Sequence, residues 1–367
     1  MRYVLGIDGG GSKTACLAAD ETGRLLGYGL GGPVNTNYVP QDIAVASMTS
    51  AISAALEGAR LEAGQIEMVC LSAPIAPHAL DEVTRICHLE HVTRAAEGAT
   101  PRWAARFWTD EHVGVTVDAG TGSLARGWTI DGREAGSGAW GATLGDEGSG
   151  YWISMQAMIA ILQAHDGRTK PTMLTQAVLQ HLGISDVLDM VFLASQGMVR
   201  SSKVDQVGVV PDSDSAYSEE NNSPSGGVFF RKRLRNEAMT RDEVAALCPV
   251  VVKVARSGDW KAIAILEEAG CELGRLGIAV IHRLGIEDEP FAVVPFGGVF
   301  RAGELILHSF RETIHTTAPN AVIIQPKFQP VVGAVLLALK GIHVEIGEQI
   351  IANIEQSSED HPACRIV

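Results

Sequence analysis

Two aspartates, Asp8 and Asp118, stand just before glycine-rich turns in "LGIDGGGSKT" (5–14) and "VDAGTGS" (117–123). Glycines let the backbone approach an anion closely and aim several N–H groups at it. A carboxylate beside such a turn repels phosphate unless a cation lies between them, and Mg²⁺ is commonly held by one or two carboxylates together with phosphate oxygens. We therefore expect Asp8 and Asp118 to share one Mg²⁺–phosphate group.

The first turn is close to the Walker A phosphate loop, G-x-x-x-x-G-K-[ST], but does not match it. Gly6 and Gly11 have the required spacing, whereas Ser12 stands in place of the lysine and Lys13 follows one residue late. A Walker loop also leads from a strand into a helix, and this turn is predicted to join two strands. A simpler alternative stays open, in which each aspartate accepts hydrogen bonds from the N–H groups of its own turn.

The segment "GSGAWGATLGDEGSGYW" (136–152) has the residue types of a sugar site. Its six glycines surround Asp146 and Glu147, and Trp140 and Trp152 flank the acidic pair. Carboxylates accept hydrogen bonds from hydroxyls, and an aromatic ring offers a platform for a sugar ring. The acidic pair also fits the first turn of a helix from residue 148, where negative charge is favourable. The two roles are compatible.

Two further polar turns are candidates for ligand contacts. Gly297 and Gly298 end an apolar strand in "VPFGGVF" (294–300), and open α/β sheets bind ligands at such strand ends. Asn35 and Asn37 lie in "GGPVNTNYV" (31–39), where they also fit ordinary turn residues.

The elements around the aspartates form a repeated pattern. Residues 2–8, 14–20 and 24–29 predict three strands, with the glycine turn between the first two. Residues 114–138 repeat the order of apolar strand, Asp, glycine turn, strand and turn. The repeat predicts a duplicated unit with a ligand between the halves, and two unrelated hairpins are the alternative.

Strands and helices are expected to alternate along the rest of the chain, which predicts an α/β protein with mixed sheets. Further strands are expected at 66–73, 291–298 and 321–326, and helices at 43–61, 79–87, 151–164, 173–182, 241–257, 259–284 and 331–339. Residues 201–236 are polar and serine-rich and are expected to be a mobile insertion. The basic run 229–235 within them fits either a solvated helix start or a phosphate contact.

Composition excludes several classes of protein. A chain of 367 residues is long enough for about two domains. Its net charge of −14 argues against a nucleic-acid partner. Apolar runs are too short for a membrane span, and the six scattered cysteines form no C-x-x-C pair. We expect a cytoplasmic protein with reduced thiols and no membrane partner.

With these motifs in place, the sequence resembles the N-acetylglucosamine kinases and the BadF/BadG-type ATPases, within the superfamily of actin-like ATPases and sugar kinases. The resemblance rests on "GIDGGGSKT", "DAGTGS", "GAWGATLGDEGSGYW" and "PFGGVF" and covers nearly the whole chain. It implies two ribonuclease-H-like domains around a central nucleotide and sugar cleft, at 1–114 and 115–334. It also implies that a final helix at about 335–367 packs back on the first domain, and that the protein is a homodimer.

The resemblance also assigns roles to residues at matching positions. It implies ATP and Mg²⁺ as cofactors, with Asp8 and Asp118 at the metal. The nucleotide would contact Gly9, Gly10, Gly11, Ser12, Lys13, Thr121, Gly122, Ala255, Gly297 and Gly298. The sugar would contact Asn37, Ser123, Trp140, Gly141 and Asp146. Glu97 and Asp146 are the catalytic candidates.

Two positions depart from the family pattern. An aspartate about 20 residues before G-T-G-S is the general base in the kinases, whereas this sequence has Glu97 at that place. Glu97 either serves as a base with a longer reach or is a surface loop residue. Ala139 replaces the glycine that usually precedes Trp140, which leaves the identity of the sugar open.

The sequence thus favours an ATP-dependent kinase that phosphorylates the 6-hydroxyl of an amino sugar such as N-acetylglucosamine. A sugar or nucleotide sensor with a weakened catalytic centre is one alternative. An activator ATPase of radical dehydratases is another, but those proteins hold an iron–sulfur cluster on cysteines near the second motif. This chain has no cysteine between Cys87 and Cys248.

Overall fold

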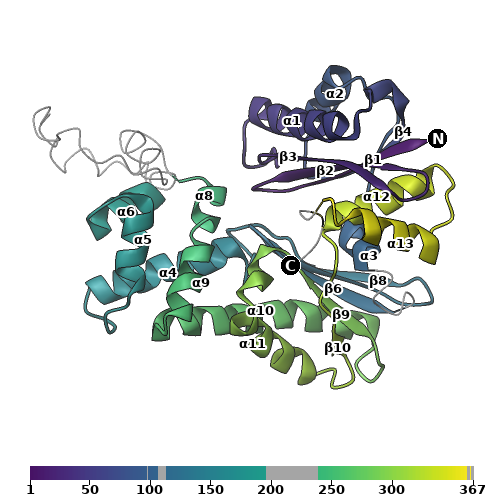
Figure 1. Ribbon diagram of the computed structural model, residues 1–367. Helices are drawn as coiled ribbons and strands as arrows, with labels where there is room; N and C mark the ends of the chain where they lie inside the picture. Colours follow the sequence, from purple (N-terminus) through teal and green to yellow (C-terminus); the bar gives the residue numbers. More distant parts are fainter. Residues whose placement is uncertain (97, 106–112, 196–238, 362–363, 365–367) are drawn as a thin grey trace, which may run out of the picture. The chain divides into compact units, whose positions relative to one another are not determined.

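The computed structural model describes residues 1–96, 98–105, 113–195, 239–361 and 364 (Figure 1). These residues form two compact units, Met1–Trp152 with Glu267–Val367, and Ile153–Leu266. The expected insertion at 201–236, its basic run and Glu97 lie outside the described residues. The domain boundary expected at residue 114 follows the division between two sheets that both belong to the first unit, and it stays a prediction.

The first unit contains two five-stranded sheets. The strands of the first sheet are β1 (Tyr3–Gly9), β2 (Thr14–Asp20), β3 (Leu25–Gly31), β4 (Ile66–Ser72) and β5 (Val92–Arg94). Those of the second are β6 (Gly114–Ala119), β7 (Ser123–Trp128), β8 (Glu134–Gly138), β9 (Ala292–Phe296) and β10 (Val322–Ile323). Every residue of β2 is buried, as the apolar run from Thr14 predicts.

The two sheets have the same topology, which confirms the duplicated α/β fold. Their strand orders are β3-β2-β1-β4-β5 and β8-β7-β6-β9-β10. In each sheet three antiparallel strands are followed by two strands parallel to the first. Asp8 therefore lies near the end of β1 in the first sheet, and Asp118 has the same place in β6 of the second.

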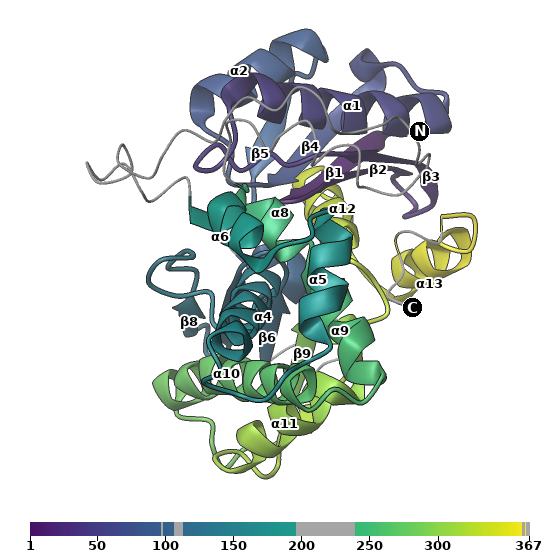
Figure 2. The ribbon, with the colours of Figure 1, turned by 90° about the vertical axis from the view of Figure 1, so that its left-hand side faces the viewer.

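Helices cover both faces of the first sheet (Figures 1 and 2). On one face α1 (Gln41–Ala59) and α2 (Pro77–Ile86) bury a cluster that includes Met48, Ile52 and Leu71. On the other face α12 (Pro330–Gly341) and α13 (Glu348–Ser357) pack on Val4 and Leu17. Two helices therefore occupy the region where one final helix was expected.

A short helix, α3 (Ala99–Ala105), contacts elements of both sheets. Its residues Ala104 and Ala105 pack against apolar side chains of β9. On its other side, the position of a Cβ on Gly333 of α12 lies 1.9 Å from the backbone oxygen of Thr100. Such a close backbone approach is possible only because residue 333 has no side chain.

The remaining helices and 3₁₀ turns are divided between the two units. The first unit also contains α11 (Glu304–His315) and the 3₁₀ turns η1 (Ala63–Gln65) and η3 (Gly298–Ala302). The second unit contains α5 (Leu174–Leu182), α6 (Val187–Ser195), α8 (Arg241–Ala245) and α9 (Cys248–Arg256). Two helices, α4 (Gly150–His165) and α10 (Trp260–Leu284), each begin in one unit and end in the other.

Several expected elements differ from those observed. The single helix expected at 241–257 is two helices, because Pro249 lacks an N–H group and fits the start of a new helix at Cys248. The strand expected at 321–326 is only Val322–Ile323. The elements β5, α3 and α6 were not predicted.

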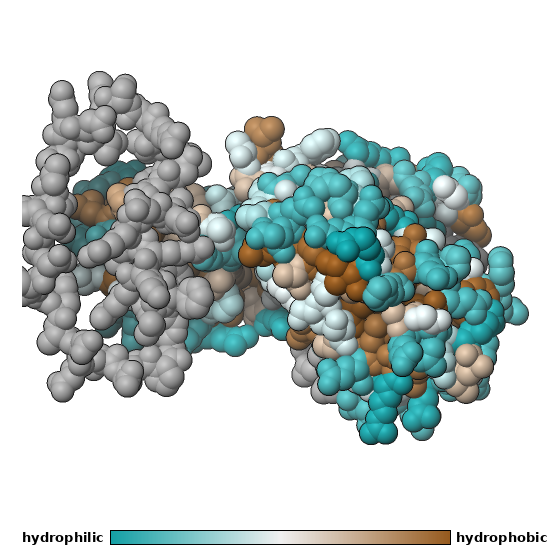
Figure 3. All heavy atoms as spheres, turned by 90° about the horizontal axis from the view of Figure 1, so that it is seen from above, coloured by the Kyte–Doolittle hydropathy of each residue, from teal (hydrophilic) through white to brown (hydrophobic). Residues whose placement is uncertain are grey.

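Polar residues cover most of the described surface in Figure 3, with smaller apolar patches between them. No single helix in the described ranges is long and apolar enough to cross a membrane, although the bent pair Leu174–Leu182 and Val187–Ala194 passes that test on length and composition.

The contact between α12 and α3 generates a stability prediction. We expect Gly333→Ala to lower the free energy of unfolding by about 1–3 kcal/mol, because the new methyl group would overlap backbone atoms that cannot rotate away. Gly341→Ala in the same helix is the control, since its methyl group would meet only the flexible Met68 side chain at 3.3 Å. Urea denaturation of both variants measures the difference, and equal stabilities would contradict the packing described here.

Candidate active site

Two tight turns at equivalent strand ends form the centre of the candidate site. In the first, Gly9 pairs with Thr14 and the Gly10 N–H donates to the Lys13 oxygen at 2.9 Å. In the second, Ala119 pairs with Ser123 and the Gly120 N–H donates to the Gly122 oxygen at 2.9 Å.

The tips of these turns touch each other. The Thr121 hydroxyl donates to the Ser12 hydroxyl oxygen at 3.2 Å. Both residues were predicted to contact nucleotide phosphates from opposite sides. The structure brings the two predicted phosphate motifs together, and their role in binding stays a prediction.

The two aspartates at the strand ends both have raised pKa values. Burial, with a smaller contribution from the negative charge of Asp8, raises the pKa of Asp118 to about 8. Burial also raises the pKa of Asp8 to about 6, although a hydrogen bond from Thr100 and the charge of Lys13 oppose the shift. The described residues around the two carboxylates therefore do not fully compensate the negative charges of their ionised forms.

These carboxylates fit a divalent cation. Among the described residues, Asp118 Oδ2 is buried without a hydrogen-bond partner, and the carboxylate of Asp8 accepts only from Thr100. A buried oxygen of this kind is unfavourable unless a ligand pairs with it. Within the described part of the chain, neither carboxylate accepts an N–H from its own turn, which argues against the turn-capping alternative. Two hard oxygen donors that leave other positions open suit Mg²⁺ bound together with phosphate.

Two cationic side chains lie near the first turn. The pKa of Lys13 is lowered by burial and by the neighbouring positive charge of Arg301, whereas Asp8 opposes this shift. Arg301 belongs to η3, which follows β9. The positive charges of both side chains suit an anion bound beside this turn. Arg301 was not among the predicted site residues.

The predicted adenosine residues lie next to the second turn. The strands β6 and β9 are parallel neighbours, and Asp118 pairs with Phe296. The next residue, Gly297, has φ 101°, and a Cβ there would lie 2.2 Å from the Ala119 oxygen. Glycine is therefore required at this position, where it allows the backbone to approach the second turn.

The predicted sugar segment is attached to the second turn through Ser123. The Ser123 N–H donates to Asp146 Oδ1 at 3.2 Å, and its hydroxyl donates to the Glu147 oxygen at 2.8 Å. Asp146 is only 2% exposed and has φ 62°, a left-handed conformation that Asp tolerates better than most residues. At the start of the following helix α4, Ser149 Oγ accepts from the Trp152 N–H at 3.2 Å.

The segment also reaches the polar turn after β3. The Tyr38 hydroxyl lies 3.0 Å from the position of a Cβ on Gly141. Asn37 is exposed, and its N–H donates to Asn35 Oδ1 at 3.1 Å, which is the turn role expected for Asn35. Trp140 is 75% exposed. Large exposed aromatic rings suit contact with a ligand, and Tyr38 was not predicted.

Three of the predicted roles stay predictions. Ala255 is buried on α9 in the second unit. Glu97 lies outside the described residues, so its role as a base stays a prediction. Asp146 bonds to Ser123, and its catalytic role is likewise a prediction. Thr100, which contacts Asp8, was not predicted, because this contact joins residues 92 positions apart in the sequence.

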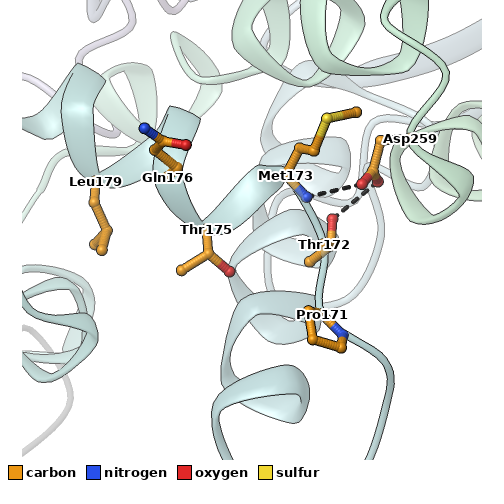
Figure 4. A pocket seen from close by; sticks show the side chains of 7 residues that line it. All are labelled: Pro171, Thr172, Met173, Thr175, Gln176, Leu179 and Asp259. Carbon is orange, nitrogen blue, oxygen red and sulfur yellow. Dashed lines mark hydrogen bonds between the residues drawn. The ribbon is translucent and has the colours of Figure 1, made fainter.

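The second unit contains an open pocket of about 600 Å³ (Figure 4). Asp259 closes one side of it, where its carboxylate accepts from the Thr172 hydroxyl at 2.9 Å and the Met173 N–H at 2.8 Å. The same carboxylate accepts two N–H groups at the start of α10. These bonds give Asp259 a structural role as a helix cap.

Comparisons with known proteins agree with the motifs. The sequence matches the model of the BadF/BadG/BcrA/BcrD ATPase family over residues 5–338. It is 26% identical over 341 residues to the N-acetylmuramic acid/N-acetylglucosamine kinase of Clostridium acetobutylicum, covering 92% of this chain and 98% of the relative. It is 25% identical over 357 residues to the N-acetyl-D-glucosamine kinase of Dictyostelium discoideum, covering 91% and 97%.

Solved structures share the fold. A candidate N-acetylglucosamine kinase from Chromobacterium violaceum superimposes with a TM-score of 0.63 at 24% identity, covering 92% of this chain and 99% of that one. A ROK family glucokinase from Streptomyces griseus, solved with glucose and AMPPNP, gives a TM-score of 0.55 at 18% identity, covering 92% and 100%.

The raised pKa of Asp118 generates a prediction about pH. Both aspartates hold protons in the folded state that the unfolded chain releases near pH 4, so their contribution to stability falls as pH rises from about 4 to about 8. We expect the Tm of the metal-free protein to decrease between pH 5 and 8.5, and to decrease less in Asp118→Asn.

The control is Asp131→Asn, which removes an exposed carboxylate whose pKa is lowered by Thr129 and Arg133. Asp131 is ionised in both states across this range, so its Tm should follow the wild-type slope. Parallel curves for Asp118→Asn and the wild type would contradict the raised pKa.

The backbone at Ala139 generates a second prediction. Its φ of 63° lies in the left-handed region, which explains why glycine is usual at this place. We expect Ala139→Gly to raise the free energy of unfolding by about 1 kcal/mol, because relief of strain exceeds the added chain entropy. Urea denaturation measures the change, and a loss of stability would contradict this conformation.

Proposed function

The chain belongs to the BadF/BadG/BcrA/BcrD ATPase family, and from this premise we propose that it is an ATP-dependent kinase of an N-acetylated amino sugar. The proposed reaction transfers the γ-phosphoryl group of ATP to the 6-hydroxyl of N-acetylglucosamine or a related sugar. The names of the two curated relatives support this substrate class.

The observation that carries the proposal is the pair of half-buried carboxylates behind two touching glycine turns. The negative charges of Asp8 and Asp118 require a cation to compensate them. Asp118 Oδ2, which has no partner among the described residues, is available to bind it. The exposed turns present backbone N–H groups, which bind phosphate without a side-chain charge. A site that requires both a cation and an anion is suited to a Mg²⁺–nucleotide.

The residues around the turns divide into two groups with different roles. Lys13 and Arg301 supply positive charge on the phosphate side, and Gly298, where a Cβ would meet nothing within 4 Å, leaves open backbone for a flat base beside Gly297. The segment of Trp140 and Asp146 supplies an aromatic surface and a carboxylate for the sugar. The bond from Ser123 to Asp146 fixes this segment relative to the second phosphate turn.

Each group would act on a different part of the reaction. Bound Mg²⁺ would offset negative charge on the transferred phosphoryl group. Asp8 and Asp118 would hold the ion, while the turn N–H groups and Lys13 would orient the phosphates. Asp146 would accept a hydrogen bond from a sugar hydroxyl and so place the acceptor. Glu97 would take the proton from the attacking 6-hydroxyl as general base.

A coupled ADP-release assay tests the proposal with N-acetylglucosamine, N-acetylmuramic acid and glucose as acceptors. We expect ADP release that depends on an N-acetylated sugar, because the relatives act on such sugars. Glu97→Gln should lower kcat by about 10²–10⁴-fold while ATP affinity is retained, since a general base contributes about this much.

Absence of sugar-dependent turnover, with sugar binding detected by calorimetry, would replace the kinase by a sugar-binding sensor. Full activity of Glu97→Gln would leave the kinase proposal intact and assign the base to another residue. Asp131→Asn, which changes an exposed carboxylate, serves as the matched control and should keep wild-type turnover.

A further inference from the structure

Thr100 is a buried hydroxyl beside one of the predicted metal carboxylates. Its side chain is 1% exposed, and its Oγ1 donates to Asp8 Oδ1 at 3.1 Å. The Ser72 hydroxyl oxygen lies 3.4 Å from the same Thr100 atom. The three residues come from β1, β4 and α3, so the contact exists only in the folded chain.

The chemistry of the hydroxyl groups determines which group accepts the Thr100 proton. A threonine hydroxyl has one proton and two lone pairs. An ionised carboxylate only accepts, so the Thr100 proton is committed to Asp8. The Ser72 hydroxyl, 3.4 Å away, then contacts Thr100 only as a weak donor, because the distance is long for a bond between hydroxyls. Donation from Thr100 to Asp8 stabilises the charged form of the carboxylate.

The backbone around Thr100 is held in place from two sides. Gly333 of α12 packs directly on the Thr100 oxygen. Ala104 and Ala105, which belong to α3 as Thr100 does, pack on β9. At the start of the helix, a Cβ on Gly98 would lie 2.4 Å from the Arg126 side chain of β7. Thr100 therefore cannot move away from Asp8 without disturbing both sheets.

The terminal torsion of an aspartate is broad, so burial alone does not fix the rotation of its carboxylate. One hydrogen bond to Oδ1 does fix it and leaves Oδ2 for another partner. We propose that Thr100 is a positioning residue of the cation site, which holds Asp8 so that its second oxygen faces the ion shared with Asp118. This inference rests on the proposed function, because it assumes the Mg²⁺–nucleotide site.

Mn²⁺ is the probe for the test, because its binding can be followed by electron paramagnetic resonance without any turnover. Mn²⁺ is titrated into the full-length protein with saturating ADP and no sugar. We expect Thr100→Val to weaken Mn²⁺ binding at least about tenfold, as loss of an outer hydrogen-bond partner does at other metal sites. Thr100→Ser keeps the hydroxyl and should bind within about threefold of the wild type.

Two further variants separate positioning from packing. Thr116→Val is the control, because Thr116 Oγ1 is a buried hydroxyl with no partner among the described residues. It should leave Mn²⁺ binding unchanged. Ser72→Ala removes the hydroxyl next to Thr100 and should give an Mn²⁺ affinity between those of the wild type and Thr100→Val. It tests the same hydrogen-bonded group if Thr100→Val does not fold. ADP binding without metal should be equal in all variants.

Wild-type Mn²⁺ affinity in folded Thr100→Val would overturn the inference, and so would a Thr100→Ser affinity as weak as that of Thr100→Val. In either case, sugar-dependent ADP release by the wild type would show that the proposed function stands. Failure of the wild type itself to bind Mn²⁺ with ADP, together with no sugar-dependent turnover, would overturn both.

Discussion

Two carboxylates of like charge lie half-buried behind adjacent turns, and their unfavourable ionisation is the constraint on which the site depends. Burial and the charge of Asp8 raise the pKa of Asp118 to about 8. A protein built only for stability would replace such a pair, since buried charges without partners are costly. The presence of this pair behind two glycine turns is explained if a bound cation compensates the negative charges of the carboxylates and of a phosphate bound at the turns.

The duplicated topology is what places these groups together. In each sheet the first strand has an aspartate as its next-to-last residue, turns back through glycines, and is flanked by a parallel strand. Parallel pairing of β6 with β9 brings Gly297 against Ala119, and pairing of β1 with β4 brings Ser72 beside Asp8. The helices α3 and α12 then connect the sheets through the Gly333–Thr100 contact. Stability and site geometry therefore depend on the same few backbone contacts.

The sequence was sufficient to predict the features that repeat along the chain or that follow a regular spacing. The apolar strands, the two aspartates in register and the glycine turns could be identified because each obeys a local rule. Thr100, Arg301 and Tyr38 could not be identified, because their importance comes from neighbours far away in the sequence. The break at Pro249 was missed since apolar periodicity continues across it. The positive φ of Ala139 explains why glycine is usual at this position, which the sequence alone could not show.

The central claim is that Asp8 and Asp118 share one cation, and proton release on binding tests it most directly. Metal binding must remove the proton that Asp118 holds at pH 7, where its pKa is about 8. Calorimetric titration of Mg²⁺–ADP in two buffers of different ionisation enthalpy measures this release. The account predicts close to one proton more for the wild type than for Asp118→Asn. Equal proton release by the two proteins would contradict it.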